Sequence, residues 1–186
     1  MDKAPEFYAK DRASWRNWLE KNHDSETSVW LVHDKGVTRT IKWEEIVLEA
    51  LCFGWIDGRA NPVSDTQLKI YVSKRKPRGR WSKINKAHVE NLMKDGLMRP
   101  AGLAAIEQAK LNGAWDELNN SDDLIHPSEL VDAFKMSPTA ANNFEAFSNS
   151  SKRLILQWIY DAKTDATREK RIQQTIESAA RNEKVR

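Results

Sequence analysis

The chain of 186 residues contains one cysteine, four histidines and no long apolar run. The single thiol, Cys52, excludes an internal disulfide and a paired-thiol metal site, and this cysteine usage is typical of a reducing compartment. The apolar stretch from Ile46 to Ile56 is interrupted by Glu49 and is far shorter than the roughly 20 residues that a membrane helix requires. The N-terminus shows no pattern of a secretory signal. We therefore expect a cytoplasmic protein that does not insert into a membrane.

Motifs for nucleotide hydrolysis, metal binding and nucleophilic catalysis are also missing. Gly79 stands alone, without a glycine-rich phosphate loop or a dinucleotide fingerprint. The histidines show no metal-ligand spacing, and no serine lies in a nucleophile-elbow sequence. We predict no metal and no cofactor. The sequence assigns no catalytic residue and therefore favours a protein that is not an enzyme.

The most unusual feature that is present is a set of eight tryptophans spread along nearly the whole chain. Such a spread indicates anchors of several structural elements rather than one aromatic box, and core packing is the default interpretation. The tryptophans are Trp15, Trp18, Trp30, Trp43, Trp55, Trp81, Trp115 and Trp158.

Hydrophobic periodicity predicts helices and strands in the first 111 residues. Helical spacing is found over 11–23, from Trp43 to a closing Gly54, over 82–94 after a cap at Ser82, and over 101–111. Strand patterns cover 28–33 and 67–73, and a strand or turn starts at Trp55. Residues 64–66 fit a hairpin connection. Helices and a few strands together indicate an α+β domain.

The last third of the chain has a different character. Residues 112–127 are rich in Asn, Asp and Ser, as expected of a loop or linker. Beyond them, one apolar stripe starts at Leu154 and a second at Ile172, which predicts two packed helices. We therefore predict an α+β fold: a helix-rich main domain with a small antiparallel sheet (1–111), a polar linker (112–127) and a small all-helical C-terminal module (128–186).

Charge is segregated although the net charge is only +3. Between Thr66 and Val89 there are eight basic residues and no acidic one. Clustered Lys and Arg create a positive potential that attracts anions, and the alternative is a solvated loop that keeps the protein soluble. The eight are Lys69, Lys74, Arg75, Lys76, Arg78, Arg80, Lys83 and Lys86.

The candidate binding site lies where this basic segment enters the predicted helix. A capped helix start offers free backbone N–H groups beside basic side chains, which suits a phosphate or carboxylate. Trp81 could stack on a ligand, but a tryptophan beside a cap more often fastens the helix to its core. Asp57 could accept a ligand or act as a base, although we favour a structural ion pair or turn cap. The predicted site comprises Trp55, Asp57, Arg75, Arg78, Trp81, Ser82 and Asn85.

Three ordered blocks of sequence resemble the YdeI/OmpD-associated, or bacteriocin-protection, family of bacterial proteins. The blocks are Ala50–Gly58, Lys74–Asn85 and Gly96–Gly102, and the stretch from Ser151 to Ile172 resembles the family's helical module. The resemblance thus extends over nearly the whole chain. It implies no catalytic residue and no ligand, and it connects the chain with tolerance to bacteriocins.

Two functions fit these observations. The first is binding of a small anionic or phosphorylated ligand at the strand-to-helix junction. The second is a non-catalytic interaction module in stress or bacteriocin tolerance that binds an acidic protein partner. Nucleic acid is not an expected partner, because the aromatic residues are too dispersed in the sequence for a stacking platform.

Overall fold

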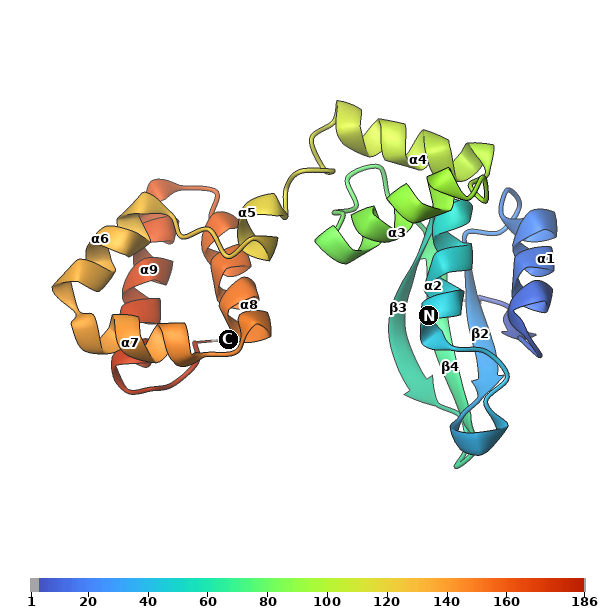
Figure 1. Cartoon of the computed structure of the whole chain (residues 1–186), viewed down its shortest axis with the longest axis horizontal. Coiled ribbons are helices and arrows are strands. Elements are labelled where there is room, and N and C mark those ends of the chain that lie inside the picture. The colour runs from blue at the N-terminus through green and yellow to red at the C-terminus, as the bar shows by residue number, and fades with distance from the viewer. Residues whose placement is uncertain (1–3, 186) are drawn as a thin grey trace. The chain divides into compact units, whose positions relative to one another are not determined.

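The structure is a computed structural model that describes residues 4–185. The chain forms two compact units, an N-terminal domain and a C-terminal domain, with the boundary between Asp116 and Glu117. The elements of the N-terminal domain, shown in Figure 1, are β1 (Glu6–Tyr8), α1 (Arg12–Asn22), β2 (Ser28–Asp34), the 3₁₀-helix η1 (Gly36–Thr38), α2 (Trp43–Cys52), β3 (Trp55–Pro62), β4 (Gln67–Lys74), α3 (Lys83–Lys94) and α4 (Pro100–Leu111). The predicted α+β class is confirmed.

A four-stranded sheet with the order β1-β2-β4-β3 forms the centre of the N-terminal domain. Its last three strands pair antiparallel, as predicted, whereas β1 pairs parallel with β2 and makes the sheet mixed. The reason is the connection: α1 lies between β1 and β2 in the chain, and a helical crossover brings two strands together in parallel. With only three residues, β1 is too short to give a periodic signal.

The two faces of the sheet have different surroundings. Successive side chains of a strand point to opposite faces, and one set is buried in the core under the helices. That set includes Val29, Leu31, Ile70 and Val72, which are fully buried together with residues of α1 and α2. Figure 1 shows α2 lying along the sheet. Trp30 and Tyr71, which are paired across β2 and β4, belong to the other face and are only partly buried.

The helices of this domain begin and end where the sequence predicts. Gly54 closes α2 with a φ of +74°, a conformation that glycine adopts without strain. Ser82 caps α3, and its hydroxyl accepts a hydrogen bond from the backbone N–H of Asn85 at 3.3 Å. Gly102 lets α4 approach α2, because a Cβ at this position would lie 2.3 Å from the carbonyl oxygen of Cys52.

The C-terminal domain contains only helices in its described residues: α5 (Asn119–Asp122), α6 (Ser128–Met136), α7 (Pro138–Ala146), α8 (Asn149–Tyr160) and α9 (Asp165–Ala180). The two predicted stripes correspond to α8 and α9. The short α6 and α7 have no comparable pattern, because each buries only two side chains spaced four apart, Leu130 and Phe134 in one and Ala140 and Phe144 in the other. These side chains form a separate core with the stripes of α8 and α9.

The polar segment 112–127 is partly folded. Its helix α5 packs against α8, and Ser121 is buried with its hydroxyl donating to the carbonyl oxygen of Leu118 at 3.0 Å. The domain boundary at Asp116 falls inside this segment. The polar composition of this segment therefore marks both the domain boundary and a short helix that packs against the C-terminal domain.

Candidate functional site

The structure distributes the seven predicted site residues over two hollows, the core and the exposed surface. Asp57, Ser82 and Asn85 line one hollow, and Arg75 lines another. Trp55 and Trp81 are core residues, with exposed fractions of 0% and 1%. Arg78 is exposed and lines neither of these hollows.

The first hollow, called here the acidic hollow, has a volume of about 400 Å³. It is lined by Trp43, Glu44, Val47, Asp57, Ser82, Ile84, Asn85 and His88. The indole N–H of Trp43 donates to a carboxylate oxygen of Asp57 at 3.0 Å, which joins the start of α2 to β3. Two carboxylates and no Lys or Arg line this space, so it repels anions.

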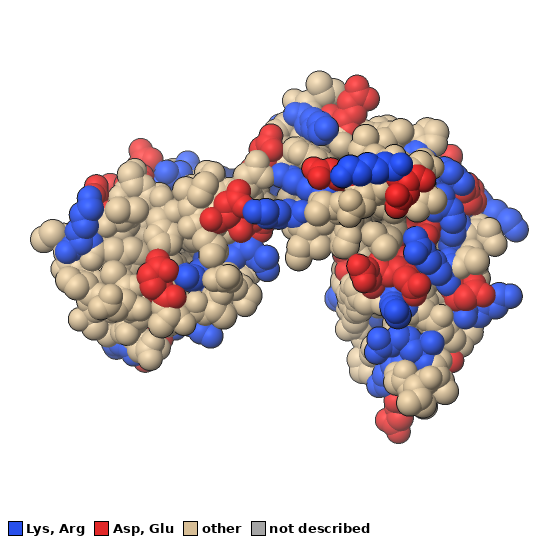
Figure 2. Space-filling model, in the orientation of Figure 1, with Lys and Arg blue, Asp and Glu red and all other residues tan. Residues whose placement is uncertain are grey.

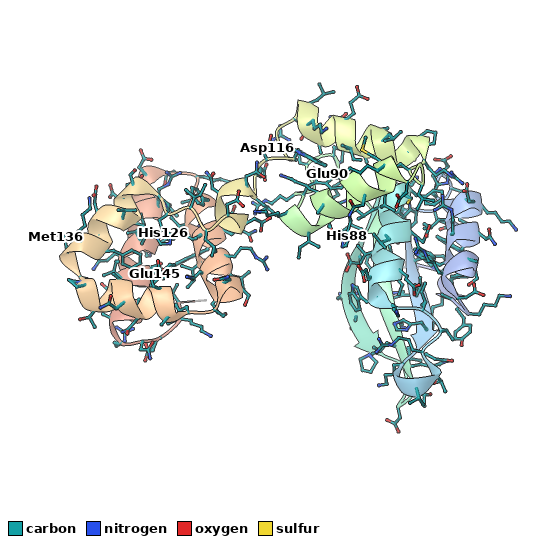
Figure 3. The ribbon with its side chains drawn as sticks, viewed as in Figure 1. His88, Glu90, Asp116, His126, Met136 and Glu145 are labelled. Carbon is teal, nitrogen blue, oxygen red and sulfur yellow. The ribbon has the colours of Figure 1, made fainter. Side chains whose placement is uncertain are left out.

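Two figures show the region of the acidic hollow. In Figure 3, His88 projects from α3 on the side of β3, whereas Glu90 points to the other side of the helix. Figure 2 shows acidic side chains gathered over the lower part of α2 on the face in view. The sequence places Trp43 in a core stripe, but it is 41% exposed, because the first turn of α2 extends beyond the core and the ring reaches Asp57 instead.

Arg75 has the most unusual surroundings of the predicted residues. Its guanidinium lies over the ring of Trp81, with Cζ 3.6 Å from the ring centroid, and its Nη1 donates to the carbonyl oxygen of Arg80 at 3.1 Å. Its Nε and Nη2 atoms are buried and have no hydrogen-bond partner. Burial lowers the pKa of Arg75 to about 10, and the negative charge of Asp57 acts against this shift. Trp81 thus holds in place a buried guanidinium that has two nitrogen atoms without a hydrogen-bond acceptor.

The second hollow, called here the basic hollow, is lined by Arg75 among other residues and has a volume of about 300 Å³. Its lining contains four basic side chains and no carboxylate. The loop over it is a tight turn in which the N–H of Gly79 donates to the carbonyl oxygen of Lys76 at 2.8 Å. The lining residues are Ile56, Ser73, Lys74, Arg75, Lys76, Gly79 and Arg80. The capped start of α3 lines the acidic hollow instead, so the structure does not combine the helix N-terminus with the basic side chains in the single site that we expect from the sequence.

The side chains that could carry catalysis or bind a metal do not converge. The thiol of Cys52 is buried, and burial raises its pKa, which disfavours the reactive thiolate. Among residues 4–185 no group of three or more His, Cys, Asp or Glu side chains is arranged to hold a metal ion. Within the same residues no helix has both the length and the apolar character to cross a bilayer. The geometry that stands out is the guanidinium of Arg75, whose Nε and Nη2 atoms have no hydrogen-bond partner.

Comparison with known proteins finds two family models along the chain. Residues 7–105 match the Domain of unknown function (DUF8412), and residues 123–182 match the family described as Bacteriocin-protection, YdeI or OmpD-Associated. The second match supports the resemblance to that family in the C-terminal domain, whereas the three N-terminal blocks lie within the first match. No curated protein and no solved structure matches the chain.

Proposed function

The chain belongs to the family of the Domain of unknown function (DUF8412), and from its site we propose that the N-terminal domain binds a small anionic ligand, phosphorylated or carboxylated, in the basic hollow. The observation that carries this proposal is the guanidinium of Arg75, whose Nε and Nη2 are buried without a hydrogen-bond partner. Buried polar groups in proteins are nearly always paired, and an exception calls for an explanation such as a functional role or a partner that is absent. An anion that enters the hollow supplies the missing acceptor oxygens.

The energetics favour an anion over a neutral ligand. A buried donor without a partner costs about 1–3 kcal/mol, and more when the group is charged. A phosphate or carboxylate oxygen removes this cost and forms the charge-assisted bonds that a guanidinium makes best. Stacking on Trp81 holds the guanidinium in place before the ligand arrives, so little side-chain entropy is lost on binding.

The charges around the hollow support the same ligand class. Lys74, Lys76 and Arg80 line the hollow with Arg75, and no carboxylate is part of the lining. The carboxylate of Asp57 belongs to the acidic hollow, and its charge favours the protonated form of Arg75. The basic hollow therefore keeps a charged guanidinium near neutral pH without placing an acidic side chain in the path of the ligand.

The test is calorimetric titration of the full chain with pyrophosphate and with citrate. We expect Arg75→Gln to weaken the binding of pyrophosphate or citrate, whichever binds the wild-type chain, at least tenfold. The substitution removes the positive charge together with the Nε and Nη2 donors. Arg78→Gln is the matched control: it removes the same charge from the same loop at an exposed position outside the hollow, and we expect an effect below about threefold. Equal losses in both variants would mean that the anions respond only to the general field of the basic segment.

A second candidate function is favoured by the match of residues 123–182 to the family whose description names bacteriocin protection. We propose that the C-terminal domain contributes to tolerance of bacteriocins through a protein partner and without catalysis. Expression of the full chain should then raise the survival of a bacterial host exposed to a bacteriocin. Arg75→Gln should protect equally, because Arg75 belongs to the N-terminal domain. Unchanged survival with the wild-type chain would exclude this function.

A further inference from the structure

The face of the sheet that points away from the core carries an aromatic pair that the sequence does not reveal. Trp30 on β2 and Tyr71 on β4 are direct cross-strand partners, with ring centroids 5.2 Å apart and an interplanar angle of 63°. Both side chains are partly exposed, and the helices of the N-terminal domain pack on the opposite face. Two aromatic residues that are 41 positions apart in the chain thus form one surface.

Cationic side chains surround this pair. The guanidinium of Arg59 lies 5.4 Å from the ring centroid of Trp30 and 6.0 Å from that of Tyr71. It reaches them because the pairing of β3 with β4 shifts between Asp57 and Ala60, and this irregularity turns Arg59 toward the outer face. The ammonium group of Lys69 lies 5.0 Å from the Trp30 ring. Rings and cations are therefore interleaved on the two central strands and β3.

This aromatic surface is continuous with the basic hollow. Ser73 follows Tyr71 by two residues on β4 and so points to the same face, and it lines the hollow together with its cross-strand partner Ile56. Arg75 follows two residues later, which places its Cα about 13 Å from that of Tyr71 at about 3.3 Å per residue. A ligand that contacts both the rings and the hollow is therefore an extended one.

We propose that this surface binds single-stranded nucleic acid, with bases stacked on Trp30 and Tyr71 and a backbone phosphate in the basic hollow. Single strands are bound by aromatic rings that stack with bases, alternating with basic groups that hold the phosphates. The phosphate contact rests on the proposed function of Arg75, whereas the stacking rests on the aromatic pair alone. Arg59 and Lys69 are already at the rings, where they can exchange ring contacts for contacts with the backbone of the strand.

The acidic residues of the same face define where the strand lies. Glu6 forms an ion pair with Lys69 at 2.7 Å, and Asp34 accepts hydrogen bonds from Tyr8 and Gln67 near the far end of β2. Asp34 pairs with Gln67 at the opposite end of β4 from Ser73, and Glu6 lies on the edge strand β1. The lining of the basic hollow, which includes Ser73 and Arg75, contains no carboxylate, so the strand runs from the rings toward this hollow.

The first experiment uses the unmodified full chain. Fluorescence anisotropy is measured with a labelled single-stranded oligonucleotide of about ten nucleotides, with an abasic strand of the same length, and with the matching duplex. The abasic strand keeps the phosphates and the duplex hides the faces of the bases, so we expect both to bind at least tenfold more weakly. Equal affinity for the abasic strand would overturn the stacking, and so would the absence of binding to the single strand.

The second experiment locates the site. Tyr71→Leu and Trp30→Leu keep apolar cover on the sheet, and each should weaken binding by roughly 5- to 150-fold, the effect expected for one stacked base. Trp43→Leu is the matched control: Trp43 is also exposed but lies in the acidic hollow, and its loss should leave the affinity unchanged. Arg59→Gln should make the slope of log K against log salt shallower by about 0.7. Equal effects of Tyr71→Leu and Trp43→Leu would contradict the proposal, and circular dichroism checks that each variant is folded.

One comparison separates this inference from the function on which it rests. If pyrophosphate binds in an Arg75-dependent manner while the single strand and the abasic strand bind alike, the anion site stands and the nucleic acid is excluded. If aromatic-dependent binding of the single strand persists in Arg75→Gln while pyrophosphate does not bind, the stacking surface stands and the anion site is excluded. An acidic peptide that binds as tightly as the strand and depends equally on Tyr71 would also overturn the choice of nucleic acid.

Discussion

Replacement of Glu49 by Gln tests how the N-terminal domain is held together. Glu49 lies in α2 with a side chain that is only 3% exposed, and its carboxylate is bound by two arginines of α1. Arg12 Nε donates to Oε1 and Arg16 Nη1 donates to Oε2, each at 2.6 Å. Arg16 also donates from Nη2 to the carbonyl oxygen of Leu97 at 3.0 Å. One buried carboxylate thus joins α1, α2 and the loop before α4.

The magnitude follows from these contacts. Breaking a buried ion pair by removing one partner costs about 3–5 kcal/mol, because the remaining charge is left without compensation. Here the remaining charges are partly solvated, since the side chains of Arg12 and Arg16 are 39% and 21% exposed. Glutamine also keeps the volume of Glu49 and one acceptor oxygen. We therefore expect Glu49→Gln to lower the free energy of unfolding by about 2–3 kcal/mol.

Denaturant unfolding, monitored by tryptophan fluorescence, measures the change in stability of the N-terminal domain. Seven of the eight tryptophans precede the boundary at Asp116, so the signal comes mainly from this domain. The midpoint should fall while the slope with denaturant stays the same. Glu44→Gln, an exposed change in the same helix, should alter stability by less than about 0.5 kcal/mol. A loss below about 1 kcal/mol in Glu49→Gln, or equal losses in both variants, would show that the two ion pairs of Glu49 do not stabilise the domain.

Three further predictions concern packing, thiol chemistry and pH. Gly102→Ala should destabilise the N-terminal domain by about 2 kcal/mol or more in the same unfolding assay, because its Cβ would lie 2.3 Å from the carbonyl oxygen of Cys52. Cys52 should resist alkylation by iodoacetamide at pH 8 in the folded chain and react in denaturant, because burial raises its pKa; rapid labelling of the folded chain would contradict this. The part of the pyrophosphate affinity that Arg75→Gln removes should be present below pH 10 and lost above it, because the pKa of Arg75 is lowered to about 10 and only the protonated form binds the anion; a loss that begins near pH 12 in calorimetry would contradict this assignment.

The elements with long periodic patterns could be predicted from the sequence. The stripe of α2, the alternation in β4 and the cap at Ser82 all correspond to local structure, because the same residues that form the pattern also form the element. β1 could not be predicted, since three residues give no period and its place depends on a partner 24 residues away. The sequence predicts α6 and α7 only as part of an all-helical module and not their bounds, because two buried side chains in each helix do not make a stripe.

The candidate site likewise has a part that could be predicted from the sequence and a part that could not. Proximity of Asp57, Ser82 and Asn85 could be expected, because a strand start and a capped helix flank one hairpin. The orientation of Arg75 could not, since stacking on Trp81 depends on how the loop from β4 to α3 turns. Nor could the pairing of Trp30 with Tyr71 be predicted, because it depends on the register of β2 and β4, which no local pattern defines.

The most direct test of the central claim is nuclear magnetic resonance of the arginine Nε–H groups in the ¹⁵N-labelled full chain, recorded while pyrophosphate is added. The buried Nε–H of Arg75 should give a slowly exchanging signal that is absent from Arg75→Gln. We expect this signal to shift saturably with pyrophosphate, because the donor gains an acceptor, whereas the signal of Arg78 moves little. If the Arg75 signal stays unchanged at pyrophosphate concentrations that shift the signals of the exposed arginines, Arg75 does not bind the anion.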